Sequence, residues 1–262
     1  MSISSHGSEP GGGMKRPYRK LSLKLRVLGE ELFVEASVPS NSCRLDEALP
    51  LLRSIDDHVI ERVARRAELQ EQTISCRKGC AACCMAQPVP VTPIEAFALW
   101  KFVESMPEPK RSEVRQRFSD RVQRLRESGL LGKFLDRDDS LSREEARRMA
   151  HDYMRLRIAC PFLENNACSI YADRPFVCRQ YLVTTPAALC RDPMSNGVKP
   201  LSMPMAPAHA VLNVTQRRFG RRQYTIPLVL ALEYAERHRA ELERVYDARG
   251  VCEELIKELA AG

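Results

Sequence analysis

The stretch "SCRKGCAACCMA", Ser75 to Ala86, decides how the rest of this chain is interpreted, because it gathers four cysteines within nine residues. They are Cys76, Cys80, Cys83 and Cys84. A cluster of this kind can belong to a disulfide framework, a catalytic thiol pair or a metal site. The remaining sequence has to distinguish among these three.

The cysteine pattern continues beyond this stretch, since eight of the ten cysteines fall between residues 76 and 190. The later four are Cys160, Cys168, Cys178 and Cys190. They are spread too widely for one short loop, so we expect them to reach the first four through the fold. Cys43 and Cys252 stand apart, and we interpret them as small apolar side chains of the core.

Composition favours a metal over disulfides. The chain has 262 residues, 44% of them hydrophobic, which is enough for a core without covalent staples. Its first residues lack the apolar run of a signal peptide, and no window approaches the roughly 18 apolar residues of a membrane helix. We therefore expect a cytoplasmic protein with no membrane contact, in which clustered thiols bind metal or do redox work. No βαβ pattern surrounds Cys80 and Cys83, so a thioredoxin-like pair is the weaker prediction.

The first four cysteines can point toward one place in either of two conformations. In a helix, steps of about 100° per residue would bring the four sulfurs within roughly a quarter of the circumference. In a loop, Gly79 and the small alanines after Cys80 would let the backbone wrap closely around an ion. Neighbouring Cys83 and Cys84 diverge, so one could bridge two ions or each could serve a different ion. We expect the cations of Arg77, Lys78, Arg174 and Arg179 to offset the thiolate charge.

The identity of the metal stays open between zinc and iron. All-thiolate ligation suits Zn²⁺ and iron–sulfur clusters alike. The spacings match neither the common ferredoxin patterns nor two zinc knuckles, and eight cysteines exceed one structural zinc. We slightly favour an iron–sulfur cluster. His151 could be a ligand or proton carrier, although a surface or core histidine is the commoner case, and Tyr171 and Tyr181 are expected to pack against the cluster.

The hydrophobic patterns predict a mainly α-helical protein with a small N-terminal β-hairpin, an α+β fold with a cysteine-rich, metal-centred core. Residues 1–20 have the composition of a disordered tail. Alternation on both sides of Gly29 predicts the hairpin, and apolar residues at helical spacing predict a helix over 45–72. Thr92 and Glu95 have the spacing of a capping box that starts another helix at Pro93. Two more helices are predicted over 110–128 and 142–157.

The C-terminal half contains shorter predicted elements. "CPFL" and "CSIY" flank the turn-prone "ENNA", which predicts a short hairpin, and "RPFVCRQY" predicts a short helix with Pro175 in its first turn. A Pro-rich loop should follow, then an amphipathic helix over 225–248 and a short helix after Gly250. We divide the chain into four parts: the tail (1–20), the hairpin and long helix (21–75), the cysteine-cluster metal-binding domain (76–195) and the C-terminal loop and helices packed on it (196–262).

The segments "CRKGCAACC" and "CPFLENNACSIYADRPFVCRQY", followed by Cys190, resemble the CxxCxxCC cysteine-cluster family, also called YkgJ-type proteins and described as zinc- or iron-chelating. The resemblance covers Cys76 to Cys190, just under half of the chain, and includes the Arg174–Pro175 pair. It implies metal binding by all eight cysteines. The same motif is similar to that of a flagellin lysine N-methylase, which implies an iron–sulfur cluster and permits an enzyme.

Three functions follow from these observations. The first is a metal-binding protein that holds an iron–sulfur cluster or zinc through the eight cysteines. The second is an iron–sulfur-dependent, protein-modifying enzyme of the lysine N-methylase kind, acting on an unknown protein partner. The third is a basic nucleic-acid interaction module with structural zinc, suggested by "RRFGRRQY" at residues 217–224 and ranked well below metal binding. The sequence assigns no catalytic residue.

Overall fold

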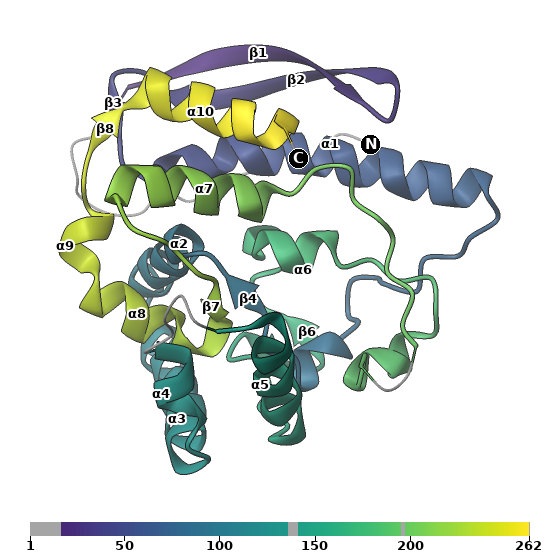
Figure 1. The fold of residues 1–262 in the computed structure, drawn as a ribbon, viewed down its shortest axis with the longest axis vertical. Helices are drawn as coiled ribbons and strands as arrows, with labels where there is room; N and C mark the ends of the chain where they lie inside the picture. Colours follow the sequence, from purple (N-terminus) through teal and green to yellow (C-terminus); the bar gives the residue numbers. More distant parts are fainter. Residues whose placement is uncertain (1–16, 136–140, 195–196, 262) are drawn as a thin grey trace.

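The computed structural model of the protein describes residues 17–135, 141–194 and 197–261. Most of the predicted tail therefore lies outside the described residues, and the first strand already begins at Tyr18. The described part is mainly helical with a small antiparallel hairpin at its N-terminal end, as predicted (Figure 1). No helix in these ranges combines the length and the apolar character needed to cross a bilayer.

The hairpin forms one outer layer of the molecule. Strand β1 (Tyr18–Val27) pairs antiparallel with β2 (Glu30–Pro39), and Leu28 and Gly29 form the turn with positive φ of 53° and 88°. Such a two-residue turn matches the twist of the strands. In β2 every second side chain is buried, and this face covers helix α1 (Figure 1).

Beneath the hairpin lie three helices that enclose the largest apolar core. They are α1 (Leu49–Leu69), which follows the 3₁₀ turn η1 (Leu45–Ala48), α7 (Pro207–Phe219) and α10 (Ala248–Ala261). Cys43 and Cys252 are buried in this core, which confirms their structural role. Cys43 belongs to the short strand β3 (Ser42–Cys43), which pairs with β8 (Tyr246–Asp247).

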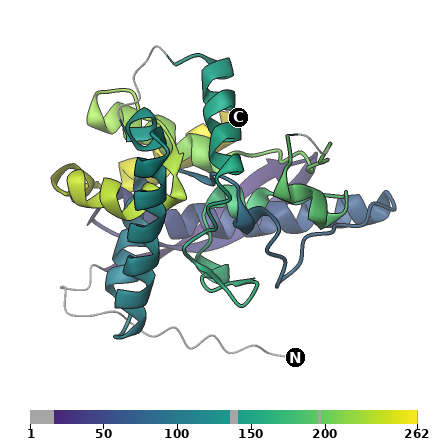
Figure 2. The same ribbon diagram turned by 90° about the horizontal axis from the view of Figure 1, so that it is seen from below.

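The next group of helices extends away from the hairpin side of the molecule. It comprises α2 (Pro93–Glu104), α3 (Lys110–Glu127), α4 (Leu130–Leu135) and α5 (Arg143–Arg155). Both predicted capping boxes are present, Thr92 with Glu95 and Ser142 with Glu145. In the view from below, α3 and α5 lie apart from each other (Figure 2).

The predicted helix over 225–248 is wrong. This stretch forms strand β7 (Ile226–Pro227), the turn η5 (Leu228–Leu230) and two short helices, α8 (Ala231–Arg237) and α9 (Arg239–Leu242). β7 pairs with β4 (Pro90–Val91), and the three side chains of η5 are all buried. A segment buried on every side has no polar face to keep it as one amphipathic helix.

The Pro-rich region is mostly loop, as predicted, and α7, which was not predicted, begins at its end. Pro207 occupies the first turn of α7, a position that proline favours. The last helix, α10, is longer than the predicted short helix and begins before Gly250.

Candidate metal centre

The first four cysteines lie in loop and not in a regular helix. Arg77 to Cys80 form a tight turn, in which Cys80 N–H donates to the Arg77 carbonyl (2.9 Å) and Gly79 has φ of +91°. After it, the chain makes one 3₁₀ turn, η2 (Cys83–Met85). Of the two predicted conformations, the loop closed by Gly79 is therefore confirmed for the first part of the cluster.

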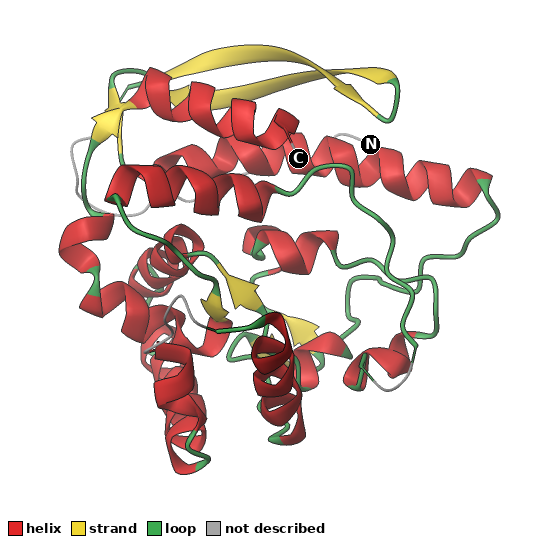
Figure 3. Ribbon diagram, in the orientation of Figure 1, coloured by secondary structure: helices red, strands yellow, loops and turns green. Residues whose placement is uncertain are grey.

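The later four cysteines belong to a part of the chain built from short elements and loops (Figure 3). Cys160 precedes a miniature hairpin of β5 (Leu163–Glu164) and β6 (Ala167–Cys168), whose turn residues Asn165 and Asn166 both have positive φ. The 3₁₀ turn η3 (Tyr171–Asp173) leads to α6 (Phe176–Gln180), which carries Cys178 and has Pro175 at its N-cap. Cys190 lies in η4 (Ala187–Arg191). The predicted hairpin and short helix are both present.

Backbone and side-chain hydrogen bonds join the two cysteine segments. Cys160 N–H donates to the Cys84 carbonyl (2.8 Å). Val183 N–H donates to Cys76 Sγ (3.4 Å), and the Cys76 thiol donates to the Tyr181 carbonyl (3.5 Å). Gln87 Nε2 donates to the carbonyl of Cys190 (2.8 Å). Segments about 75 to 110 residues apart in sequence thus meet in one region.

The sulfurs are close enough to act electrostatically on one another, and they fall into two groups. Burial, followed by the charges of neighbouring thiols, raises the pKa of both Cys76 and Cys190, and of Cys190 to about 11. Cys76, Cys80 and Cys190 make up the first sulfur group, since Cys80 acts on both of the other two. Cys84, Cys160, Cys168 and Cys178 make up the second sulfur group.

In the second sulfur group, the pKa of two thiols is strongly raised. Burial raises the pKa of Cys160 to about 12 and that of Cys178 well above its ordinary value, and neighbouring thiols add to both effects. Cys160 and Cys168 also pack against apolar side chains of α2 and α3. Without a cation these cysteines are neutral thiols at physiological pH.

Cys83 interacts with members of both sulfur groups. The Cys84 thiol donates a hydrogen bond to it, which lowers the pKa of Cys83 and raises that of Cys84. A charged Cys83 in turn raises the pKa of Cys76 and Cys190 in the first group and of Cys160 and Cys178 in the second.

As the side chains are placed, no three Cys, His, Asp or Glu residues in the described ranges are arranged closely enough to hold an ion. The eight thiols are gathered in one region without being closed around a point. Neutral thiols are weak hydrogen-bond partners, so little draws them into a tetrahedron until they are deprotonated. The donor set itself, eight sulfurs from one region, has the chemistry that zinc and iron–sulfur clusters require.

Of the four predicted counter-charges, Arg174 is the one with an effect on several thiols. Its charge lowers the pKa of Cys83 and opposes the raised pKa of Cys178, and its guanidinium lies 3.7 Å from the ring centre of Tyr171. Arg179 binds Asp56, Asp57 and the Ala172 carbonyl instead, so its predicted role is wrong. Arg77 and Lys78 are exposed at the turn.

The remaining residues singled out from the sequence are less central. Tyr181 borders the first sulfur group, because burial and then the charge of Cys190 raise its pKa. Tyr171 is exposed, and the Arg174 guanidinium lies over its ring. His151 is exposed on α5, where it lines a surface hollow with arginines.

Residues 75–196 match the model of a family that carries the description "Putative zinc- or iron-chelating domain". We call residues 75–196 the CxxCxxCC domain, after the family model that they match. The matched residues span all eight clustered cysteines, and the resemblance seen in the sequence is confirmed. No curated protein and no solved structure matches the chain.

Within the CxxCxxCC domain, α3 contributes contacts that sequence reasoning missed. Arg117, Arg121 and Arg124 follow one another at helical spacing and donate to backbone carbonyls on either side of Cys160. Arg117 Nη1 bonds the Pro161 carbonyl (3.1 Å), Arg121 Nε that of Ala159 (3.3 Å) and Arg124 Nη2 that of Leu156 (2.6 Å). The signal in the sequence was this spacing, since the three residues share one helix face.

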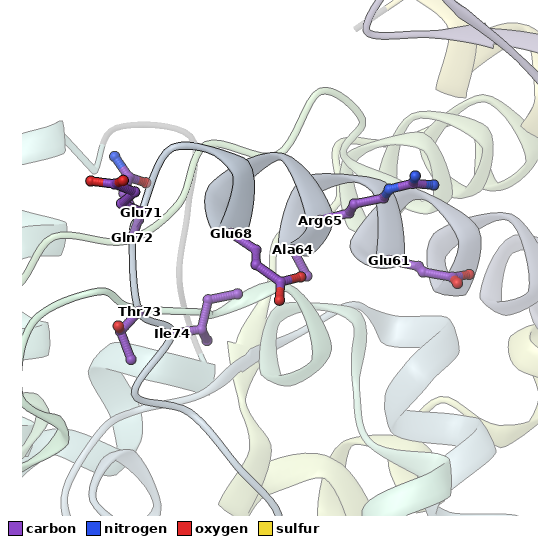
Figure 4. Close-up of a pocket in the computed structure, with 8 residues that line it drawn as sticks. All are labelled: Glu61, Ala64, Arg65, Glu68, Glu71, Gln72, Thr73 and Ile74. Carbon is purple, nitrogen blue, oxygen red and sulfur yellow. The ribbon is translucent and has the colours of Figure 1, made fainter.

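A surface hollow at the C-terminal end of α1 is separate from the sulfur groups of the CxxCxxCC domain (Figure 4). Its lining consists of Glu61, Ala64, Arg65, Glu68, Glu71, Gln72, Thr73 and Ile74. Acidic and basic side chains both contribute, and these residues lie before the first clustered cysteine in the chain. The hollow therefore adds no residue to the candidate metal centre.

The basic stretch at residues 217–224 is largely matched by acids of the same chain. Arg217 pairs with Glu258, Arg218 with Glu254 and Arg221 with Glu241. Charges that are paired within the chain attract phosphates less strongly than free ones. These ion pairs weaken the case for a nucleic-acid interface.

Proposed function

We propose that this protein binds metal through its eight clustered cysteines, as an iron–sulfur cluster or as Zn²⁺, with iron–sulfur slightly preferred. The observation that carries the proposal is the meeting of two distant thiol-rich segments at the Cys84–Cys160 and Cys76–Val183 hydrogen bonds. Thiolates are the ligands that both metals favour. A second line of support is the family description, which names zinc and iron.

The electrostatics of the site support a bound cation. Burial, and then the charges of neighbouring thiols, raise the pKa of Cys160 and Cys178. Metal binding replaces the protons and puts positive charge among the sulfurs, which turns mutual repulsion into attraction. Bound zinc would tie the two segments together, and a bound iron–sulfur cluster would in addition supply one-electron chemistry.

The arrangement of the sulfur groups supports the slight preference for iron–sulfur. Two independent zinc sites would each take four thiolates with no shared ligand. Cys83, however, acts on members of both groups. A shared sulfur between neighbouring groups fits a centre with several metal ions better than two separate zinc ions.

The protein-modifying enzyme and the nucleic-acid module stay predictions. The enzyme is suggested by the resemblance to a lysine N-methylase, and the described residues add no specific support for it. The nucleic-acid module loses support from the ion pairs of Arg217, Arg218 and Arg221.

The test is elemental analysis and absorption spectroscopy on protein purified without oxygen. We expect metal bound to the chain, with brown colour and visible absorption for an iron–sulfur cluster. Colourless protein with stoichiometric zinc would retain metal binding and reject the iron–sulfur preference. A reduced, folded chain that takes up neither Zn²⁺ nor iron and sulfide would overturn the proposal. Cys252→Ala is the matched control, because this cysteine is buried in the core.

A further inference from the structure

Helix α6, which carries Cys178, is too short to hold its own position. It has five residues, Phe176–Gln180, and isolated helices shorter than about 12–15 residues are marginal in water. Its place must be set by contacts with other elements, and it lies against α1, α7 and β4. The contacts at its two ends come from two buried carboxylates.

Glu95 of α2 holds the first residue of α6. Its side chain is 3% exposed, and Oε1 accepts the N–H of Phe176 (2.8 Å). Oε2 accepts the N–H and the hydroxyl of Thr92 (both 2.9 Å). One carboxylate thus closes the capping box of α2 and binds the start of the Cys178 helix.

Asp56 of α1 holds the last two residues of α6. It is 1% exposed, and it accepts from Gln180 Nε2 (2.7 Å) and Arg179 Nε (3.3 Å). Gln180 Nε2 also donates to the Met205 carbonyl (3.0 Å), in the segment before α7. Cys178 therefore lies between two anchored ends.

Buried carboxylates are costly, and stability alone is a weak reason for them. An apolar residue at either position would pack into the core without desolvating a charge. Their bonds are directional, however, and both carboxylates direct theirs at α6 from opposite ends. The pattern is that of the hydrogen-bonding shell that orients ligands around a metal.

We propose that Glu95 and Asp56 are positioning residues for Cys178, which fix α6 so that its sulfur faces those of Cys84, Cys160 and Cys168. The inference rests on the proposed metal function for its purpose, but the placement of Cys178 can be tested without metal. Asp56 lies outside the matched segment, so α1 takes part in the centre although it contains none of its cysteines.

The experiment compares Glu95→Gln and Asp56→Asn with a matched control, Glu145→Gln. Glu145 forms the same capping box with Ser142, at 2.8 Å to the N–H and 2.6 Å to the hydroxyl, but it is exposed and starts α5, which carries no cysteine. The first measurement is the alkylation rate of each cysteine in reduced, metal-free protein, followed by mass spectrometry. The second is the affinity for Zn²⁺ alone, in competition with a chelator.

We expect faster alkylation at Cys178 in Glu95→Gln and Asp56→Asn, and an unchanged rate at Cys80. We also expect Zn²⁺ affinity about 10–100-fold weaker, the usual effect of removing a group that orients a ligand, and no change in Glu145→Gln. Equal acceleration at all eight cysteines would mean general destabilisation and overturn the inference. Wild-type rates and affinity in both variants would overturn it as well.

Failure of the metal proposal gives a different result. Wild-type protein that binds no Zn²⁺ counts against the proposed function, while the alkylation pattern at Cys178 still decides the positioning role. If Glu95→Gln does not fold, Gln180→Ala removes a bond to Asp56 from the half-buried end of α6 and is judged by the same two measurements.

Discussion

At the scale of single residues, Cys83 is where the two sulfur groups meet. It accepts a hydrogen bond from the Cys84 thiol, and its charge raises the pKa of Cys76 and Cys190 as well as of Cys160 and Cys178. For Cys190, in contrast, burial raises the pKa most, and the thiols that add to it are Cys76, Cys83 and Cys80. The two cysteines should therefore differ in how much metal depends on them.

We predict that Cys83→Ser loses metal from both groups, whereas Cys190→Ser keeps the metal of the second group. With four thiolates per centre, Cys190→Ser should retain roughly half of the wild-type metal. Metal per chain, measured by elemental analysis after identical loading, checks this, with Cys252→Ala as the control. Equal losses in the two variants would show that the sulfurs act as one undivided site.

Asp56 gives a pH-dependent prediction at the same scale. Burial raises its pKa from 3.8 to about 6, and the bonds from Gln180 and Arg179 only partly oppose this. The folded protein then keeps the proton over a pH range in which the unfolded chain has lost it. The protonated Asp56 side chain therefore stabilises the folded state. This stabilisation is complete below pH 3.8, amounts to on the order of 3 kcal/mol, and is lost as the pH rises through about 6.

Asp56→Asn removes this titration. The free energy of unfolding of the wild type, minus that of Asp56→Asn, should fall between pH 4 and pH 7 and then stay level. Urea denaturation of reduced, metal-free protein at several pH values measures the difference. Parallel curves for the two proteins would mean that Asp56 titrates normally in the fold.

At the scale of elements, α3 anchors the hairpin that follows Cys160. Arg117 donates to the Pro161 carbonyl and pairs with Glu164 (2.7 Å), and its side chain is only 22% exposed. Arg126 lies on the same helix but binds Gln123, on its own exposed surface. The two arginines provide a matched pair for testing the anchor.

Arg117→Ala should loosen the β5–β6 hairpin, because it removes a hydrogen bond to a backbone carbonyl and an ion pair together. We expect a loss of about 1–3 kcal/mol in unfolding free energy and faster amide exchange over residues 158–170, while Arg126→Ala leaves both unchanged. Hydrogen–deuterium exchange with mass spectrometry locates the effect. Unchanged exchange around Cys160 in Arg117→Ala would show that apolar packing alone holds the hairpin.

The elements that were predicted correctly carry their signals locally. The capping boxes at Thr92 and Ser142 depend on residues three positions apart, and the "ENNA" turn depends on two asparagines that tolerate positive φ. The segment 225–248 failed because β7 is fixed by pairing with β4, more than 130 residues away. The roles of Glu95 and Asp56 were missed for the same reason, since their partners lie over 80 residues along the chain.

At the scale of the whole molecule, the largest apolar core contains none of the eight clustered thiols. This core joins the hairpin, α1, α7 and α10. Of the cysteines in the described residues, it contains Cys43 and Cys252 alone. The clustered cysteines lie instead on loops and on short elements such as η2, β6, α6 and η4. The cysteines could be found from the sequence because they are rare, whereas the separation of core and site depends on the tertiary fold.

This separation predicts what removal of metal does. Chelation of the loaded, reduced protein should lower amide protection over residues 75–90 and 158–192, because these two stretches carry all eight clustered cysteines. Protection in α1, α7 and α10 should persist, because the apolar core that joins them contains none of the eight clustered cysteines. Hydrogen–deuterium exchange before and after chelation measures both regions in one sample, and reloading with metal should restore the first. Loss of protection throughout would mean that the centre holds the whole fold together, and no change in either region would remove its structural role.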